Sequence, residues 1–485
     1  MQPISSLSPQ PLWRWFETIC SIPHPSKQEI ALRDHIQAWA EARGLETQLD
    51  QVGNLIIRKH ATAGMETRKG VILQAHLDMV PQKNADTDHD FGTDPIRAHI
   101  DGDWVTADGT TLGADNGIGM ASALAVLEAD DLEHGPIEVL LTIDEEAGMT
   151  GAFGLEAGVL TGEILINTDS EEEGEVYMGC AGGVDAALTL TVAREALPEE
   201  MATVEIALTG LKGGHSGCDI HLGRGNANKL LARFLFGHGD ELGLRLSALR
   251  GGSLRNAIPR EAWMTVSLPQ ANLARLEQRI SEFRALLENE LAAVEPGLSL
   301  TLSSADAPAE VFAAADQQTL VALMHAAPNG VIRMSDEFDG VVETSLNMGV
   351  VTTQQSGVEI LCLIRSTIDS GRSMVENMLS ALAQLAGAEL SLSGAYPGWQ
   401  PDAASPIMQV VRETYQRKFG SLPNIMVIHA GLECGLFKKP YPKLDMVSIG
   451  PTIRFPHSPD EKVEIATVEK YWQLLTEVLK AIPNR

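Results

Sequence analysis

The stretch VILQAHLDM at residues 71–79 decides the expected fold. It begins as a compact apolar run of strand length, and a His and an Asp follow where that strand would end. Two similar runs come later, IEVLLTI at 137–143 and ILI at 164–166, and an Ala-, Met- and Leu-rich segment at 117–129 indicates a helix between them. This alternation predicts an α/β domain with a mostly parallel central sheet flanked by helices.

Earlier in the chain, Ser26 and Glu29 have the spacing of a capping box. They precede an amphipathic pattern that begins at Ile30 and ends near Gly44. The pattern therefore predicts a helix that covers one face of the sheet.

Small and turn-forming residues divide the chain. The stretch 179–184 is rich in small residues, and 393–406 contains several glycines and prolines. Between them, strand patterns alternate with helical segments such as 273–291. We expect an inserted α+β lid or dimerisation domain, so the predicted segments are 1–184 (catalytic, first part), 185–398 (inserted) and 399–485 (catalytic, second part).

Composition excludes several classes of protein. With 36 basic and 65 acidic side chains among 485 residues, the formal net charge is −29, which argues against nucleic-acid coating and against electrostatic binding to anionic lipid. No apolar run approaches the roughly 18–20 residues that span a bilayer, and no signal peptide is visible. The five cysteines lack CxxC spacing, which disfavours a disulfide framework or a thiolate metal cage. We expect a soluble, cytoplasmic protein.

Four segments place acidic or histidine side chains near the ends of predicted strands. Each has a structural alternative: His76 as a buried hydrogen-bonded imidazole, Asp115 as a helix cap, and the acids at 144–146 as a solvated turn. Asp169 follows the fourth strand. Because open α/β sheets form their sites at the carboxyl ends of parallel strands, we expect these side chains to converge.

Histidine and carboxylates without cysteine suit divalent cations such as Zn²⁺, Mn²⁺ or Co²⁺. A second imidazole is expected, and PHSPDE at 456–461 supplies His457. Glu145 and Glu146 would point to opposite sides, so one could bind metal while the other handles a proton. The Gly-rich loop at 111–119 lacks the Lys-Ser/Thr pair of a phosphate loop.

The motifs HLDMV, TLGADNGIG, DEEAG, NTDS, GGHSG and PHSPDE resemble, in order and spacing, those of the cocatalytic dizinc metallopeptidases. That superfamily includes aminoacylase, carboxypeptidase G and the carnosinase-like dipeptidases. The strings at 213–217, 220–228 and 429–435 resemble one branch, the bacterial aminoacyl-histidine dipeptidases, also called β-alanyl-histidine dipeptidases or peptidase D. The resemblance covers essentially the whole chain.

The resemblance implies two divalent metal ions per chain, with zinc expected first and Co²⁺ or Mn²⁺ as alternatives. Asp115 would bridge both ions. His76 and Asp169 would complete one site, and Glu146 and His457 the other.

The same resemblance implies the catalytic groups. Glu145 would be the general base for a hydroxide held between the two ions, and Asp78 would orient His76. His215, in the inserted domain, would polarise the scissile carbonyl, so that the site is complete only when the domains close.

Three further residues match substrate-binding positions. Asn256 and Arg365 would bind the substrate backbone or carboxylate, while Glu433 would meet an amino group or, alternatively, be a paired structural carboxylate. The implied reaction is hydrolysis of short unblocked dipeptides, Xaa-His including β-alanyl-histidine (carnosine). The size of the inserted domain favours a homodimer, and a monomer whose duplicated lid completes the site is the alternative.

Three other functions stay open at this point. An N-acyl-amino-acid amidohydrolase or tripeptidase of the same family would keep the same metals and base. A two-carboxylate glycosidase could use Glu145, although the aromatic content of 5% disfavours a sugar-stacking groove. A metal-dependent scaffold would need no second glutamate beside Glu146.

Overall fold

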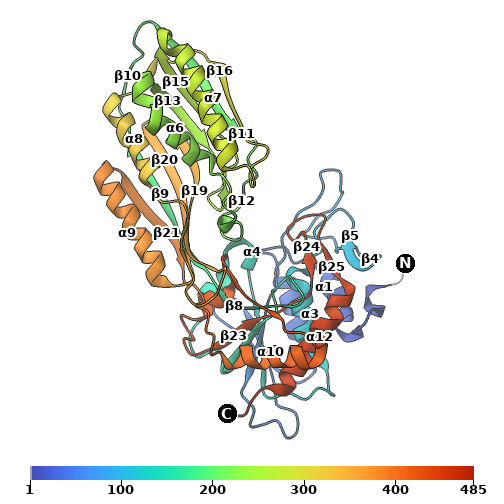
Figure 1. Cartoon of the computed structure of the whole chain (residues 1–485). Coiled ribbons are helices and arrows are strands. Elements are labelled where there is room, and N and C mark those ends of the chain that lie inside the picture. Colours follow the sequence, from blue (N-terminus) through green and yellow to red (C-terminus); the bar gives the residue numbers. More distant parts are fainter. Residues whose placement is uncertain (1–2) are drawn as a thin grey trace. The chain divides into compact units, whose positions relative to one another are not determined.

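The computed structural model describes residues 3–485, which form two compact units (Figure 1). Unit 1 contains the residues up to Cys180 together with Trp399–Val427 and Leu432–Arg485. Unit 2 contains Ala181–Gly398 and the short segment Ile428–Gly431. The predicted domain functions and their boundaries stay a prediction.

Unit 1 is built on an eight-stranded sheet with the order β1-β2-β6-β3-β7-β23-β8-β22. The four inner strands β6, β3, β7 and β23 pair in parallel, whereas β1–β2, β2–β6 and β23–β8 are antiparallel. The predicted α/β fold is confirmed, and the three apolar runs of the sequence form three of the parallel strands. The bounds are β1 Glu46–Leu49, β2 Leu55–Lys59, β3 Val71–His76, β6 Ile137–Thr142, β7 Ile164–Asn167, β8 Glu175–Cys180, β22 Asn424–Ile428 and β23 Asp445–Ser448.

Helices cover this sheet. Every residue of β3 and β6 is buried, as expected for parallel strands with both faces covered. A second, four-stranded sheet has the order β24-β25-β5-β4 and joins the last part of the chain to its first part. The remaining elements of unit 1 are α1 Gln10–Ser21, α2 Ile30–Ala42, β4 Ala98–Asp101, β5 Trp104–Ala107, α3 Ala114–Glu128, α4 Glu145–Gly148, α5 Thr150–Gly154, α10 Pro406–Phe419, α11 Glu433–Phe437, β24 Ile453–Arg454, β25 Lys462–Glu464 and α12 Ile465–Ala481, with a 3₁₀ turn at Ile4–Ser6.

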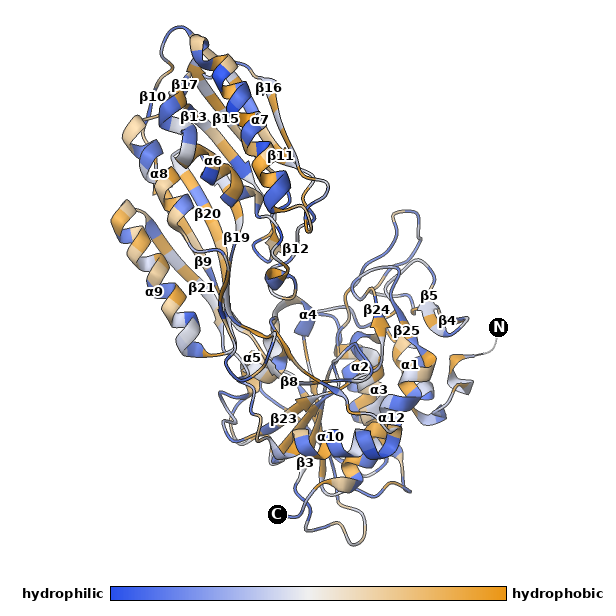
Figure 2. Cartoon of the chain, viewed as in Figure 1, coloured by the Kyte–Doolittle hydropathy of each residue, from blue (hydrophilic) through white to orange (hydrophobic). Residues whose placement is uncertain are grey.

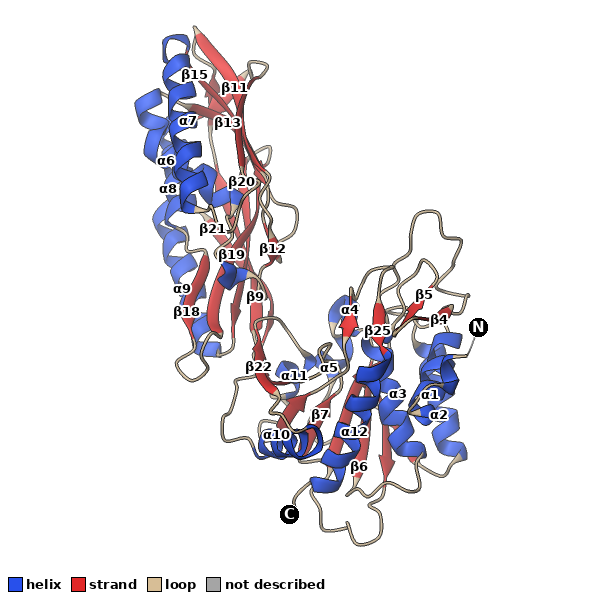
Figure 3. Cartoon of the chain, turned by 45° about the vertical axis from the view of Figure 1, so that its right-hand side comes forward, coloured by secondary structure: helices blue, strands red, loops and turns tan. Residues whose placement is uncertain are grey.

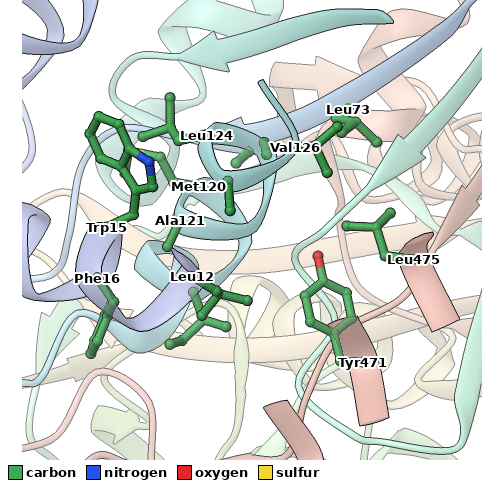
Figure 4. Packing of buried hydrophobic residues seen from close by; sticks show 14 of the residues in the cluster. Leu12, Trp15, Phe16, Leu73, Met120, Ala121, Leu124, Val126, Tyr471 and Leu475 are labelled. Atoms are coloured by element: carbon green, nitrogen blue, oxygen red, sulfur yellow. The ribbon is translucent and has the colours of Figure 1, made fainter. Parts of the chain in front are cut away.

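The core of unit 1 holds α1, α3 and α12 together (Figure 4). Leu12 and Phe16 of α1 are fully buried, and each such side chain contributes about 1.5–3 kcal/mol of transfer free energy. A Cβ atom at Gly117 would lie 2.9 Å from the ring of Phe16, so the close approach of α1 and α3 requires glycine there. The buried Tyr471 hydroxyl lies 2.7 Å from the Ser122 hydroxyl, which satisfies both groups.

The predicted capping box is wrong, although α2 begins where the sequence indicates. Glu29 is the N-cap residue, and no side chain caps the helix. The Ser26 hydroxyl instead donates to Asp78 at 2.7 Å, and the Glu29 carboxylate accepts the Asp144 N–H at 2.9 Å. Both side chains are therefore used by the loops that follow β3 and β6.

Unit 2 contains a nine-stranded sheet with the order β16-β11-β15-β13-β19-β20-β9-β21, and β18 pairs with β19. Its helices α6–α9 lie along one face (Figure 3), and α7 and α9 alternate hydrophobic and hydrophilic residues as helices with one buried face do (Figure 2). None of the helices within residues 3–485 has both the length and the apolar character needed to cross a membrane. The bounds are β9 Gly182–Thr191, β10 Arg194–Ala196, β11 Met201–Thr209, β12 Gly214–His215, α6 Ala227–Leu242, β13 Arg245–Gly251, β14 Ala257–Ile258, β15 Ala262–Pro269, α7 Leu273–Glu290, β16 Ser299–Ser304, β17 Glu310–Phe312, α8 Ala314–Ala326, β18 Gly330–Met334, β19 Val342–Thr353, β20 Gly357–Ser366, α9 Asp369–Ala386 and β21 Glu389–Tyr396.

Candidate active site

The structure of unit 1 brings together the five side chains expected to bind metal. They come from segments far apart in the sequence, and most of them lie at strand ends. His76 ends β3, Asp115 lies in the non-helical first turn of α3, Glu146 follows β6, Asp169 follows β7, and His457 lies between β24 and β25.

Asp115 lies between the two imidazoles. Its Oδ1 is 3.2 Å from Nε2 of His76, and its Oδ2 is 3.2 Å from Nε2 of His457. The His76 Nε2 atom is also 3.4 Å from Oδ1 of Asp169, and the His457 Nε2 atom is 3.1 Å from Oε2 of Glu146. The result is two donor groups, each with one imidazole and two carboxylate oxygens, that share Asp115.

These spacings fit divalent cations. Donors about 2.0–2.2 Å from a tetrahedral ion lie about 3.3–3.6 Å from one another, close to the separations between these side chains. Ligand atoms of His76, Asp115 and Glu146 all lie within 4.8 Å of one another. In the described part of the chain, the buried Oε1 of Glu146 has no hydrogen-bond partner, so it is free to bind an ion.

His76 is held by the main chain of Asp78. Its Nδ1 lies 2.9 Å from the Asp78 carbonyl oxygen, so Nδ1–H donates there and the Nε2 lone pair faces Asp115. The Asp78 carboxylate is 3.5 Å from Nδ1, too far for a good hydrogen bond. Asp78 therefore contacts His76 as expected, but mainly through its carbonyl group.

The Asp78 carboxylate instead fixes the turn that presents the two glutamates. It accepts the N–H of Glu145 at 2.9 Å and the N–H of Glu146 at 3.2 Å, together with the Ser26 hydroxyl. Burial alone would raise the pKa of Asp78, but its hydrogen bonds and the nearby imidazole hold this pKa at about 2. The group is a carboxylate at neutral pH, as these donors require.

The electrostatics of the cluster favour bound cations. Hydrogen bonds to Asp115 and Glu146 raise the pKa of His457 to about 11. Burial raises the pKa of Asp169 to about 7. Burial also raises the pKa of Glu145 well above its ordinary value, and the charges of nearby carboxylates add to the shift. Carboxylates outnumber imidazoles here, and a divalent cation would stabilise their charged forms.

Two residues fix the loop around Asp115. Gly113 has φ +72°, and a Cβ atom there would lie 3.1 Å from Sδ of Met79, so both conformation and space favour glycine. Asn116 donates its amide N–H to Oδ1 of Asp169. The loop is thereby tied to the end of β7.

Glu433 is buried at the beginning of α11. Its Oε2 accepts hydrogen bonds from Gln74 at 2.6 Å and from Thr142 at 2.8 Å. Its Oε1 has no partner among residues 3–485. Burial raises the pKa of Glu433 to about 8. The structure therefore gives Glu433 both the paired oxygen of a structural carboxylate and a second oxygen that lacks a donor.

Unit 2 has its own polar cluster, centred on Arg365 at the end of β20. The guanidinium lies 3.3 Å from the Ser216 hydroxyl, 3.2 Å from the Tyr396 hydroxyl and 3.4 Å from Nε2 of His215. Arg365 is only 5% exposed, and no carboxylate pairs with it in the described chain. The chemistry of a buried cation without an anion suits an acidic group.

The tautomer of His215 follows from its surroundings. Its Nδ1 accepts the N–H groups of Gly217 at 3.2 Å and Cys218 at 3.0 Å, so the ring proton lies on Nε2. Burial, with the charge of Arg365, lowers the pKa of His215 to about 4, and the ring is neutral at pH 7. His215 Nε2–H and Arg365 are thus two donors 3.4 Å apart, an arrangement that suits an acceptor oxygen between them.

Asn256 lies beside this cluster. It is exposed and precedes β14, and its carbonyl oxygen accepts the Ser216 N–H at 2.9 Å. The amide of Asn347 holds the main chain on both sides of Asn256, which fixes this loop. His429, also in unit 2, lies 2.7 Å from the Ser345 hydroxyl and is 6% exposed.

A family model described as peptidase family M20/M25/M40 matches residues 72–481. The chain belongs to this family. The match confirms the resemblance that the motifs indicate, and it includes all the residues expected to bind metal, to catalyse the reaction or to bind substrate.

Two relatives of the M20/M25/M40 peptidase are similar over its whole length. The cytosol non-specific dipeptidase of Escherichia coli K12 is 61% identical over 485 residues, which is 100% of both chains. The crystal structure of an aminoacylhistidine dipeptidase from Vibrio alginolyticus is 63% identical, covers 100% of this chain and 99% of that one, and has a TM-score of 0.94. An aminopeptidase PepT from Bacillus cereus shares the fold, with 16% identity, a TM-score of 0.61 and coverage of 98% and 99%.

Several polar residues of the M20/M25/M40 peptidase carry no signal in the sequence. Asn116 follows Asp115, and Glu461 ends the string PHSPDE, yet neither residue has a spacing that indicates its contacts. Ser216 and Tyr396 contact Arg365 only because unit 2 folds around them. Residues that bind main-chain groups or form tertiary hydrogen bonds follow no local pattern.

Proposed function

We propose that this M20/M25/M40 peptidase is a metal-dependent dipeptidase of the cytoplasm that hydrolyses short unblocked dipeptides, Xaa-His and carnosine among them. The observation that carries the proposal is the pair of donor groups that share Asp115. The names of the two full-length relatives support the substrate class, and the name of the Escherichia coli relative supports the location.

His76, Asp169 and Asp115 would hold one divalent ion, and His457, Glu146 and Asp115 the other. Zinc is the first expectation, with Co²⁺ and Mn²⁺ as alternatives that suit the same donors. Two bound cations would lower the pKa of water and polarise the scissile carbonyl.

Glu145 is the proposed general base. It adjoins the proposed ligand Glu146 on α4, and its main chain is fixed by the Asp78 carboxylate. Its raised pKa suits a group that takes a proton from the attacking water and returns it to the leaving nitrogen near neutral pH.

The substrate-binding residues are proposed from the chemistry of each cluster. His215 Nε2–H would donate to the carbonyl oxygen as negative charge develops on it. Arg365 would bind the substrate carboxylate, and Asn256 the substrate backbone. Glu433 Oε1, which lacks a donor, would accept the free amino group.

Chelation with metal rescue tests the proposal. Metal analysis should find about two equivalents of a divalent ion, and exhaustive treatment with EDTA should abolish hydrolysis of carnosine and other dipeptides. Restoring Zn²⁺, Co²⁺ or Mn²⁺ should return activity. Full activity after removal of metal would contradict the proposal.

Substrate comparison separates the proposed dipeptidase from its sister enzymes. A free dipeptide, its N-acetylated form and the corresponding tripeptide should be hydrolysed in that order of preference. Preference for the acetylated form indicates an N-acyl-amino-acid amidohydrolase, and preference for the tripeptide indicates a tripeptidase. The proposed homodimer is checked by light scattering.

A further inference from the structure

One buried carboxylate outside the proposed ligand set contacts the loop that bears Asp115. Glu461 is 2% exposed and lies just before β25. Its Oε2 accepts the N–H groups of Leu112 at 2.7 Å and Gly113 at 2.9 Å. Its Oε1 accepts those of Ala114 at 2.8 Å and Asp115 at 3.2 Å.

Four successive main-chain donors on one side chain require an anion. Each oxygen of Glu461 accepts two N–H groups, so neither can hold a proton without losing an acceptor position. Hydrogen bonds to a charged group are stronger than neutral ones, and these four are not replaced by water because the group is buried. A glutamine of the same shape would direct an NH₂ group toward two N–H donors.

These contacts join two distant parts of the chain. Glu461 lies four residues after His457, and its own N–H donates to the Ser458 carbonyl oxygen at 2.9 Å. Its carboxylate accepts the main-chain N–H of Asp115, and Oδ2 of Asp115 lies 3.2 Å from Nε2 of His457. One side chain therefore ties the loop that bears His457 to the loop that bears Asp115.

We propose that Glu461 is a positioning residue, whose carboxylate sets the place of the shared ligand Asp115 relative to His457. The inference rests on the proposed function, because it assigns Glu461 to the assembly of the same metal site. Without this anion, the loop 112–115 loses its only common acceptor among the described residues, and Asp115 no longer meets both imidazoles.

The test compares Glu461→Gln, Glu461→Asp and a matched control, Glu138→Gln. Glu138 is also buried in unit 1 and also receives four hydrogen bonds, from Arg58, Thr161 and Gly162. It lies near the first residue of β6, whereas the proposed metal ligand Glu146 follows the last residue of that strand. Metal-free proteins are titrated with Co²⁺, and binding is followed by visible absorption and by competition with a chelator. Thermal unfolding of the metal-free proteins monitors the fold.

We expect Glu461→Gln to weaken Co²⁺ binding at least tenfold and Glu461→Asp, which keeps an anion, to weaken it less. Glu138→Gln should change Co²⁺ affinity less than twofold even where it lowers the unfolding temperature. A packing role for Glu461 predicts the opposite order, because glutamine preserves the volume and aspartate leaves a gap. That reversed order, or unchanged affinity in both variants, overturns the inference.

Two further outcomes are informative. If Glu461→Gln does not fold, Glu461→Asp is compared with Glu461→Ala. Co²⁺ binding that is weakened at least tenfold in Glu461→Ala and clearly less in Glu461→Asp supports the inference, whereas equal affinity in the two variants overturns it. If the wild-type protein binds no Co²⁺, the proposed function fails and the inference with it. Wild-type binding together with unaffected variants overturns only the role of Glu461.

Discussion

The same side chain, histidine, meets opposite surroundings in the two units. In unit 1, His457 lies among carboxylates, and its hydrogen bonds to Asp115 and Glu146 raise its pKa to about 11. In unit 2, burial and the charge of Arg365 lower the pKa of His215 to about 4 and that of His429 to about 3. Unit 1 has an excess of anionic groups, whereas unit 2 has a buried cation and neutral imidazoles.

The difference supports the ligand that is proposed for each cluster. An excess of carboxylates around imidazoles favours cations, because a cation replaces protons that the cluster otherwise takes up. A buried guanidinium beside an imidazole N–H favours an anionic or polarised oxygen. A dipeptide, with a carboxylate and an amide carbonyl, supplies oxygens for the second cluster, and the first cluster suits the ions that activate water.

The largest expected effect is the loss of kcat when Glu145 is replaced. Glu145→Gln should lower kcat by about 10²–10⁴-fold, because an amide cannot take the proton from water. Bound metal, measured by elemental analysis, should stay near the wild-type level, because Glu145 makes no contact with either imidazole among the described hydrogen bonds and ion pairs.

Glu146→Gln is the matched control for this change. It alters the adjacent residue, whose Oε2 lies 3.1 Å from His457, and it should reduce metal content. If Glu145→Gln retains near-normal kcat, or if it loses metal as Glu146→Gln does, the division of roles between the two glutamates is wrong.

The next effect concerns His215. His215→Ala should lower kcat by about 10²–10³-fold, the range found when one donor to a developing oxyanion is removed. Metal content should not change, because His215 contacts Arg365 and the main-chain N–H groups of Gly217 and Cys218, none of which is a proposed metal ligand. Steady-state kinetics with metal analysis measures both quantities.

The exposed His221, in the 3₁₀ turn Ile220–Leu222, provides the comparison. His221→Ala removes an imidazole six residues away and should leave kcat within about twofold. Loss of metal from His215→Ala would make His215 a ligand and would remove the contrast between the two units.

The fold and most of the unit 1 cluster follow from local patterns in the sequence. Apolar runs end in polar residues, and parallel strands bring those ends to one edge of the sheet, so His76, Glu146 and Asp169 could be expected to meet. The capping box failed for a physical reason. Ser26 and Glu29 have the right spacing, but tertiary partners, the Asp78 carboxylate and the Asp144 N–H, take up both side chains.

Other features depend on tertiary contacts that no local pattern in the sequence indicates. Nothing in PHSPDE indicates that Glu461 accepts four main-chain N–H groups, because that depends on a loop about 350 positions earlier in the chain. The tautomer of His215 likewise depends on the folded loop, in which the N–H groups of Gly217 and Cys218 donate to Nδ1 of His215. The sequence indicates which residues carry the chemistry more readily than which residues hold them in place.

The smallest expected effect is the change in the free energy of unfolding with pH that the buried His429 of unit 2 causes. Burial, followed by the charges of Arg365 and His215, lowers its pKa to about 3, whereas an unfolded histidine titrates near 6.5. Between these values the unfolded chain binds a proton that the folded chain does not, so the stability is complete above pH 6.5 and decreases as pH falls toward 3. For one such group the loss is about 2 kcal/mol between pH 7 and pH 5. His429→Gln should remove this part of the dependence of stability on pH, measured from urea unfolding curves of the metal-free protein. The control variant His60→Gln, which changes an exposed histidine of unit 1, should keep it. If the free energy of unfolding changes with pH in the same way in the wild type and in His429→Gln, the imidazole of His429 is not held neutral by burial. The contrast between a unit 1 cluster that binds protons and a unit 2 cluster that excludes them would then be wrong.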